Sequence, residues 1–173
     1  MKTRNLIYCA LFAALGAIFS AYLSIEIPMG GSKIVEISLT PVFVMLAGIL
    51  FGPLLGALTG FVADTAGFFM GVQHGAYNPA FAITMAIFGL IAGLMFLKQQ
   101  RYSWIRVLLL CIIAQLICSV GLNTLAIYYF YGVPLKVLFV PRLLAALVEI
   151  PVYYIAIMAI LKGLAPLIKK NSL

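Results

Sequence analysis

Charged side chains are scarce in this chain of 173 residues, where Asp, Glu, Lys and Arg make up 9% of the sequence, against about 25% in soluble globular domains. Hydrophobic residue types instead account for 65%. A soluble protein of this length could not bury so much apolar surface, because small domains leave a large fraction of their chain at the surface. Six membrane spans of about 20 residues would take up most of the length. The composition therefore predicts a small polytopic membrane protein without a soluble domain.

The residue types that build most enzyme sites are also few. His74 is the only histidine and the four carboxylates are spread over four segments, which argues against a metal centre because such sites need several converging ligands. Asp64 is the only aspartate, which excludes the multi-aspartate sites of membrane phosphotransferases, and neither a GxSG sequence nor a nucleotide-binding motif occurs. We therefore expect no enzyme activity, no metal and no cofactor. We interpret His74 as a solvated loop residue or, as the alternative, as part of a pocket lining.

Hydrophobic runs separated by polar connectors predict an all-α integral membrane protein in which six transmembrane helices form one compact bundle. The Gly52-Pro53 pair divides a long stretch without Lys or Arg, because proline is favoured at the first position of a helix. Residues 25–39 are too polar to span, and the alternating residues 33–38 could form a short strand or an extended lid. A single domain, residues 1–173, contains the approximate spans 5–24, 39–52, 53–71, 79–97, 105–130 and 141–162.

The basic residues predict the orientation of this bundle. With six spans, both termini and eight of the eleven Lys and Arg residues lie on one side of the membrane. Positive residues accumulate on the cytoplasmic side, so we expect the N and C termini to be cytoplasmic. One span in place of 39–52 and 53–71 would instead put the basic cluster at 98–106 outside. The eight residues are Lys2, Arg4, Lys98, Arg101, Arg106, Lys162, Lys169 and Lys170.

A few polar residues lie within the apolar zone. An ionised group at the centre of a membrane helix costs about 2.5–3.5 kcal/mol, so Asp64 and Glu149 are candidates for function. Asp64 could contact a ligand or form a structural ion pair with Arg142. Glu149 is predicted to form a structural pair, whereas Asn123 could equally bond another helix or contact a ligand. The same topology places three cations on or near the outer face: Lys33, Lys136 and Arg142.

Small residues form a strip on the first predicted helix. Ala10 and Ala14, like Ala13 and Ala17, are four residues apart and so share a helix face. In a membrane such a strip indicates the close approach of another helix, from the same chain or from another protein. Neither a nucleotide motif nor a proton-relay chain of carboxylates is present to supply energy. The sequence therefore predicts a binding protein in the membrane that needs a partner to drive transport.

Several segments over nearly the whole chain resemble the substrate-binding S components of energy-coupling-factor (ECF) vitamin transporters. They include the Ala-x-x-x-Ala strip of Ala10 and Ala14, and the run LAGILFGPLLGA at residues 46–57 followed by DTAG at 64–67. Three further segments are most similar to the folate-specific S components, namely YNPAF at 77–81, NTL at 123–125 and PRLL at 141–144.

This resemblance implies a division of labour between subunits. An S component captures its vitamin outside the bacterial plasma membrane, while a membrane-embedded coupling subunit (the T component) and two ABC ATPases provide the energy. Members of the family are thought to topple in the membrane and so carry the pocket inward. Ala10 and Ala14 would then form the docking surface for the coupling subunit. The likeness implies high-affinity folate binding; the alternatives are another anionic vitamin such as pantothenate, or a structural subunit without a ligand.

Folate suits the residues that the resemblance implies. Its pterin ring presents adjacent N–H donors that one carboxylate, Asp64, could accept as a pair, and such charge-assisted bonds are about twice as strong as neutral ones. The rings need aromatic or aliphatic walls. The glutamate tail needs cations near the mouth, such as Lys33, Arg142 or Lys136. The predicted ligand-binding residues are Lys33, Asp64, Phe68, Tyr77, Asn78, Phe81, Asn123 and Arg142.

Overall fold

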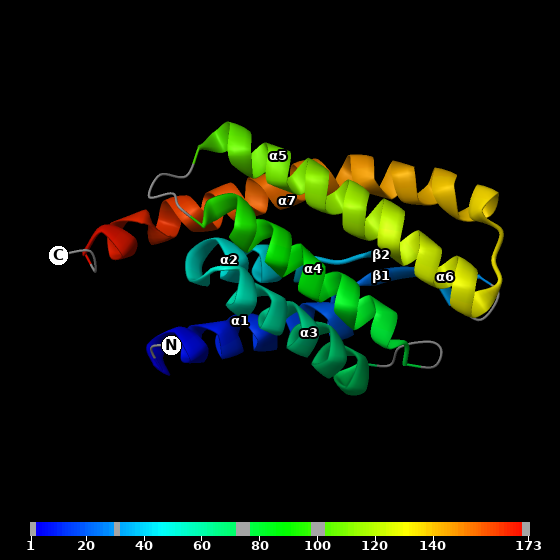
Figure 1. The fold of residues 1–173 in the computed structure, drawn as a ribbon, viewed down its shortest axis with the longest axis horizontal. Helices are drawn as coiled ribbons and strands as arrows, with labels where there is room; N and C mark the ends of the chain where they lie inside the picture. The colour runs from blue at the N-terminus through cyan, green and yellow to red at the C-terminus, as the bar shows by residue number, and fades with distance from the viewer. Residues whose placement is uncertain (1–2, 30–31, 72–76, 98–102, 171–173) are drawn as a thin grey trace.

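The chain folds, in a computed structural model, into a helical bundle with one short β-hairpin (Figure 1). The structure describes residues 3–29, 32–71, 77–97 and 103–170, and only the backbone of residues 25–29, 32–36 and 164–170. The elements in chain order are α1 (Thr3–Tyr22), β1 (Ile25–Met29), β2 (Ser32–Ile37), α2 (Thr40–Phe51), α3 (Pro53–Met70), α4 (Pro79–Phe96), α5 (Trp104–Ala114), the π-helix η1 (Gln115–Asn123), α6 (Thr124–Tyr131) and α7 (Leu135–Lys170).

Five helical segments of the described chain are long and apolar enough to cross a membrane. They are α1, α3, α4, the continuous segment Trp104–Tyr131 and the part of α7 from Leu135 to Gly163. α2 has 12 residues, which span about 18 Å and so fall short of the hydrocarbon thickness of about 30 Å. The all-α membrane bundle is thus confirmed, with a second helix that is shorter than a full span. Of the two alternatives for residues 33–38, the structure shows the short strand, as β2.

Close backbone contacts hold α2, α3 and α4 together. A Cβ atom at Gly56 would lie 2.6 Å from Cα of Gly48, and one at Gly89 would collide with the carbonyl oxygen of Gly56. Gly52 has a different role, because its φ of 94° is a conformation that glycine adopts without the usual steric cost. It ends α2, and Pro53 begins α3. The glycine pattern therefore both turns the chain and allows three helix backbones to touch.

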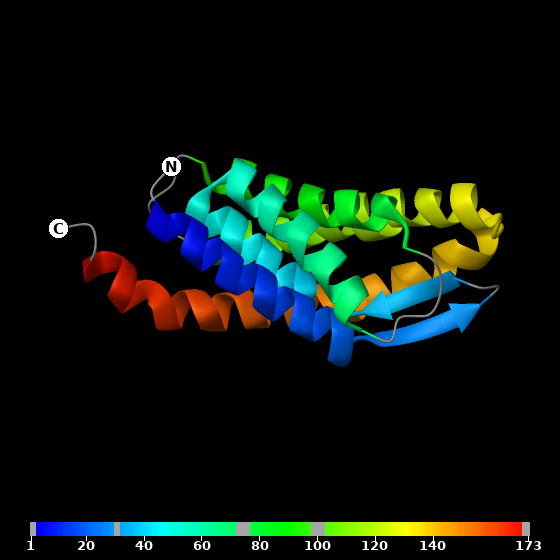
Figure 2. The same cartoon turned by 90° about the horizontal axis from the view of Figure 1, so that it is seen from below.

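The hairpin lies at one end of the bundle. β1 pairs antiparallel with β2, from Ile25 opposite Ile37 to Met29 opposite Ser32. Figure 2 shows the hairpin at the end of the molecule opposite to the first turn of α1. The last turn of α7 lies at the same end as the first turn of α1 (Figures 1 and 2), so the hairpin and the two terminal turns are well separated.

The last helix begins earlier than the predicted span 141–162. Gly132 ends α6 in a left-handed conformation, a common helix end, and the amide of Val137 already bonds the carbonyl oxygen of Pro134. α7 therefore starts at Leu135 and continues through Pro141, although proline removes one helical hydrogen bond. Arg142 consequently lies about two turns inside the helix, not in its first turn as the span 141–162 implied.

Candidate ligand-binding site

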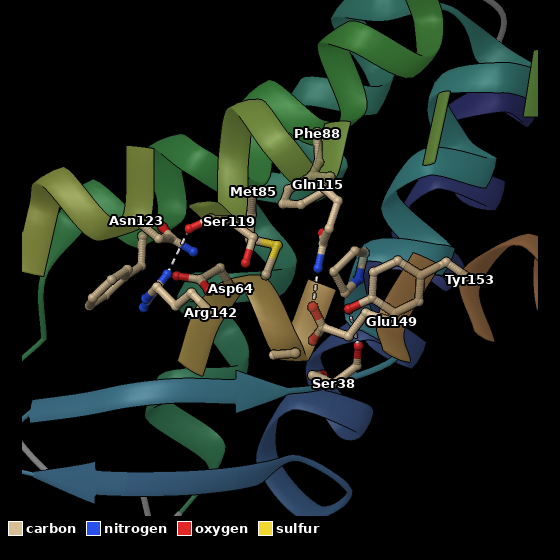
Figure 3. Close-up of a pocket in the computed structure, with 13 residues that line it drawn as sticks. Ser38, Asp64, Met85, Phe88, Gln115, Ser119, Asn123, Arg142, Glu149 and Tyr153 are labelled. Carbon is tan, nitrogen blue, oxygen red and sulfur yellow. Dashed lines mark hydrogen bonds between the residues drawn. The ribbon is translucent and has the colours of Figure 1, made fainter. Parts of the chain in front are cut away.

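A cavity lies between two groups of helices, which we call the N-terminal half (α1–α4) and the C-terminal half (α5, η1, α6 and α7) (Figure 3). Its empty space, including the part open to solvent, amounts to about 610 Å³. The side chains that line it are Ser38, Pro41, Asp64, Phe81, Met85, Phe88, Gln115, Ser119, Asn123, Arg142, Ala145, Glu149 and Tyr153.

Asp64 and Arg142 enter this cavity from opposite halves of the bundle. Arg142 is 6% exposed, and its Nη1 donates a hydrogen bond of 2.8 Å to the backbone oxygen of Ser119. Because Ser119 belongs to η1, this bond joins α7 to the π-helix. In Figure 3 the carboxylate of Asp64 and the guanidinium of Arg142 point toward one another. The structure therefore brings together the two residues for which we considered either a ligand contact or an ion pair.

A second polar group lies further along α7. Gln115 and Glu149 are 1% and 3% exposed, and Nε2 of Gln115 donates a hydrogen bond to the Glu149 carboxylate. The hydroxyl of Tyr153 donates a hydrogen bond of 2.8 Å to the backbone oxygen of Ser38. These bonds join α7 to η1 on one side and to the segment before α2 on the other. Glu149 has the structural pairing that its sequence position suggested, and it also lines the cavity.

Two amide oxygens of cavity-lining residues, Oε1 of Gln115 and Oδ1 of Asn123, have no hydrogen-bond partner within the described residues. Buried polar atoms are nearly always bonded, and leaving one unsatisfied costs about 1–3 kcal/mol. Both atoms are acceptors, and the lining also carries two carboxylates against one guanidinium. The cavity therefore offers acceptors to the N–H donors of a ligand and disfavours an anionic group where the ligand is enclosed.

Four of the eight predicted ligand-binding residues line this cavity: Asp64, Phe81, Asn123 and Arg142. Lys33 lies in β2, and its side chain falls outside the described part of the structure. His74, the residue with two possible interpretations, also falls outside the described residues. The remaining three predicted residues, Phe68, Tyr77 and Asn78, do not line the cavity.

Those three residues lie at the junction of α3 and α4, where they have local partners. The rings of Phe68 and Tyr77 meet edge to face with centroids 5.2 Å apart, and the Tyr77 hydroxyl lies 3.0 Å from that of Thr65 within a hydrogen bond. Oδ1 of Asn78 accepts the amide of Ala80 at 3.0 Å and so caps α4, a role for which asparagine is well suited. The structure thus gives Asn78 a capping function and does not place it at the cavity.

The predicted ligand-binding set omitted five polar residues that line the cavity, one of which, Glu149, had been a candidate for function: Gln115, Ser119, Glu149, Tyr153 and Ser38. The first two share a four-residue step with Asn123 along the chain, and residues four apart lie on the same side of a helix. That spacing was a usable signal. Tyr153 offered no such pattern, because its partner Ser38 is 115 residues away in sequence.

The alanine strip of α1 divides into two faces. Ala13 and Ala17 are buried, whereas Ala10 and Ala14 are exposed. The first pair therefore packs within the chain. The second pair forms a smooth outer surface on which no described residue of the chain packs closely enough to bury it.

Comparisons with known proteins agree with this architecture. Residues 4–161 match the family model described as ECF transporter, substrate-specific component. The chain is 31% identical over 156 residues to a folate transporter FolT of Clostridium novyi, with 90% of this chain and 87% of that protein covered. It is 27% identical over 157 residues to a FolT of Leuconostoc mesenteroides, with 88% and 81% covered.

Two solved structures share the fold. A crystal structure of FolT bound with folic acid superposes with a TM-score of 0.76 at 26% identity, over 89% of this chain and 91% of the other. The S component of a bacterial ECF transporter gives 0.68 at 18% identity over 98% and 99%, a likeness of fold alone. Because the family model covers most of the sequence and the architecture agrees, the chain belongs to the family of substrate-specific components of ECF transporters.

Proposed function

We propose that this protein is a folate-binding S component, which captures folate outside the cell and delivers it inward. The observation that carries the proposal is the acceptor-rich cavity, with two buried amide oxygens unsatisfied among the described residues. A pterin ring carries several N–H donors and no formal charge, so it matches this lining. The relative of 31% identity that is named a folate transporter and the superposition on a FolT bound with folic acid support the same ligand.

The charges of the cavity suggest how the ligand is oriented. Asp64 accepts paired N–H donors of the ring, Arg142 holds that carboxylate in place, and Phe81 and Asn123 complete the enclosed contacts. The glutamate tail is anionic and lies outside the carboxylate-rich cavity, toward Lys33 and Lys136. Phe68 and Tyr77 pack against one another at the junction of α3 and α4 and do not form a wall of the cavity.

The alternative ligand, pantothenate, fits this lining less well. It is an anion with few N–H donors, and it would meet two carboxylates and two unsatisfied acceptor oxygens. A structural subunit without a ligand would leave those buried acceptors without compensation. Both alternatives therefore become outcomes of the binding experiment.

Delivery requires partners that supply energy. We propose that Ala10 and Ala14 dock on the membrane-embedded coupling subunit, because their face is exposed and smooth enough for close helix approach. Two ABC ATPases drive the coupling subunit, and the S component topples in the bacterial plasma membrane with both termini on the cytoplasmic side. ATP hydrolysis takes place in those partners, so this chain is not an enzyme.

Binding of tritiated folic acid to the purified chain in lipid nanodiscs tests the ligand assignment. We expect saturable binding that excess unlabelled folic acid displaces and that pantothenate and riboflavin do not. Displacement by pantothenate would contradict the assignment of folate as the specific ligand. Absence of binding to any of the three vitamins would favour the structural subunit without a ligand.

A further inference from the structure

The side-chain amide of Gln115 is held in one orientation. Its Nε2 donates to an oxygen of the Glu149 carboxyl group, and a carboxyl oxygen that carries no proton can accept hydrogen bonds but cannot donate them. Turning the amide over would place Oε1 against the carboxylate oxygens. The contact with Glu149 therefore directs Oε1 away from α7, as an acceptor whose position is fixed.

That acceptor is available to a ligand. Gln115 is 1% exposed, it lines the cavity, and its Oε1 has no partner among the described residues. Figure 3 shows the side chain descending from η1 into the cavity, with its nitrogen toward Glu149. The bond to Glu149 alone would connect η1 with α7, and the buried Oε1 remains as an acceptor of a residue that lines the cavity.

We propose that Gln115 determines ligand specificity by accepting a hydrogen bond from a ring N–H of the bound molecule, and that Glu149 is the positioning residue that fixes its amide. The inference rests on the proposed function, because the ring concerned is the pterin of folate. A site built to accept a hydrogen bond discriminates strongly against analogues that lack the donor, since its buried acceptor is then left unpaired. Asp64 and Gln115 would thus contact different donors of one ring from the two halves of the bundle.

Analogues that each lack one ring donor test this inference in the full-length chain. An N3-methyl analogue of folic acid lacks the N3–H, and a 2-methyl analogue lacks the 2-amino group. Dissociation constants of folic acid and both analogues are measured for the wild type, Gln115→Met and Glu149→Gln. Methionine keeps the length of the side chain and removes the acceptor. Thr84→Val is the matched control, because its hydroxyl is buried but bonds the carbonyl oxygen of Ala80 and does not line the cavity.

We expect Gln115→Met to raise the dissociation constant of folic acid about 10–100-fold. For the analogue that lacks the donor to Gln115, the dissociation constant should rise less than about 3-fold, so that discrimination against that analogue is largely lost. Glu149→Gln should reduce the same discrimination partly, because a glutamine there can also donate and lets the Gln115 amide turn over. Thr84→Val should leave both ratios unchanged. If Gln115→Met raises the dissociation constants of all three ligands by the same factor, the ratios between them stay unchanged and the inference is overturned. Failure of the wild type to bind folic acid is seen before any variant is compared, and it would refute the proposed function itself.

Discussion

The N-terminal and C-terminal halves of the bundle differ in how closely their helices approach. In the N-terminal half the backbones of α2, α3 and α4 touch, and a Cβ atom added at Gly60 or Gly93 would collide with the backbone of a neighbouring helix. In the C-terminal half a Cβ atom at Gly121 would meet only the carbonyl oxygen of Leu116, at 3.3 Å, and one at Gly163 would meet nothing within 4 Å. The N-terminal half is therefore tightly packed, and the C-terminal half is packed more loosely.

The two halves also differ in polarity. The C-terminal half supplies most of the polar groups of the cavity, including Gln115, Asn123, Arg142 and Glu149, whereas the N-terminal half supplies Asp64 together with apolar side chains such as Phe88. Close packing of small residues leaves little room for polar side chains between helices. The polar groups therefore collect in the half where η1 and α7 leave space for them.

The largest effect that this comparison predicts is on stability. Gly89→Ala should destabilise the protein by about 1–3 kcal/mol or more, because the added methyl group collides with the backbone of α3 and overpacking cannot be relieved there. Gly121→Ala, the matched change in the C-terminal half, should alter stability by less than about 0.5 kcal/mol. Thermal unfolding midpoints and the yield of monodisperse protein measure both. Equal losses of stability in the two variants would show that the two halves do not differ in packing.

The next effect concerns the contact between the halves. Asp64→Asn should weaken folate binding by about 1.5–3 kcal/mol, which is about 10–100-fold, because an amide cannot accept from two donors as a carboxylate does. The fold should persist, as checked by the thermal midpoint. If Asp64→Asn binds folate normally while variants of Arg142 fail to fold, the pair is a structural bridge and not a ligand site.

A third prediction uses the outer face of the N-terminal half. Ala14→Trp adds volume on the exposed side of α1, so folate binding by the isolated chain should be unchanged while ATP-driven uptake and co-purification with the coupling subunit fall. Ala13→Trp is the matched change on the buried side, where Ala13 is 5% exposed, and it should reduce yield and folate binding together. A loss of folate binding in Ala14→Trp would show that this face packs within the protein.

The smallest perturbation tests the orientation of the bundle. Lys136 and Trp104 are both exposed. Trp104 begins α5 and Lys136 lies in the first turn of α7, and these two helix starts lie at opposite ends of the C-terminal half (Figure 1). In a background without native cysteines, Lys136→Cys should react with an impermeant maleimide added to intact cells, and Trp104→Cys should react only after permeabilisation. The reverse pattern would place the termini outside and contradict the charge distribution.

Local signals in the sequence were informative about where helices begin. Pro53 and Pro79 stand at the first position of α3 and α4, because a proline lacks the amide that has no partner there. The predicted start of the last helix at 141 was too late, because α7 begins at Leu135, directly after Pro134 and about two turns before Pro141. A proline can thus begin a helix or be tolerated inside one, and tertiary contacts decide between the two.

The site was harder to predict than the fold, because its contacts join distant parts of the chain. Asp64 and Arg142 stand out as rare charges in apolar segments. Because burying a charge there costs free energy, their positions alone indicated a functional or structural role. Asn78 carries two competing signals, a polar residue near a pocket and a cap before proline, and only the structure distinguishes them. Gln115 gains its importance from Glu149, 34 residues further on, and no local pattern reveals that pairing.

The π-helix η1 has a consequence for chain length. Its i to i+5 bonding accommodates more residues per turn than an α-helix does, and the cavity residues Gln115 and Asn123 lie at its two ends. Removing Val120 would shorten the segment by one residue and allow α-helical bonding, in which fewer residues complete the same turns, so the residues on the two sides of the deletion would keep nearly their present faces. The same deletion in an α-helical part of the chain, such as α5, would instead rotate everything after it by about 100° around the helix axis.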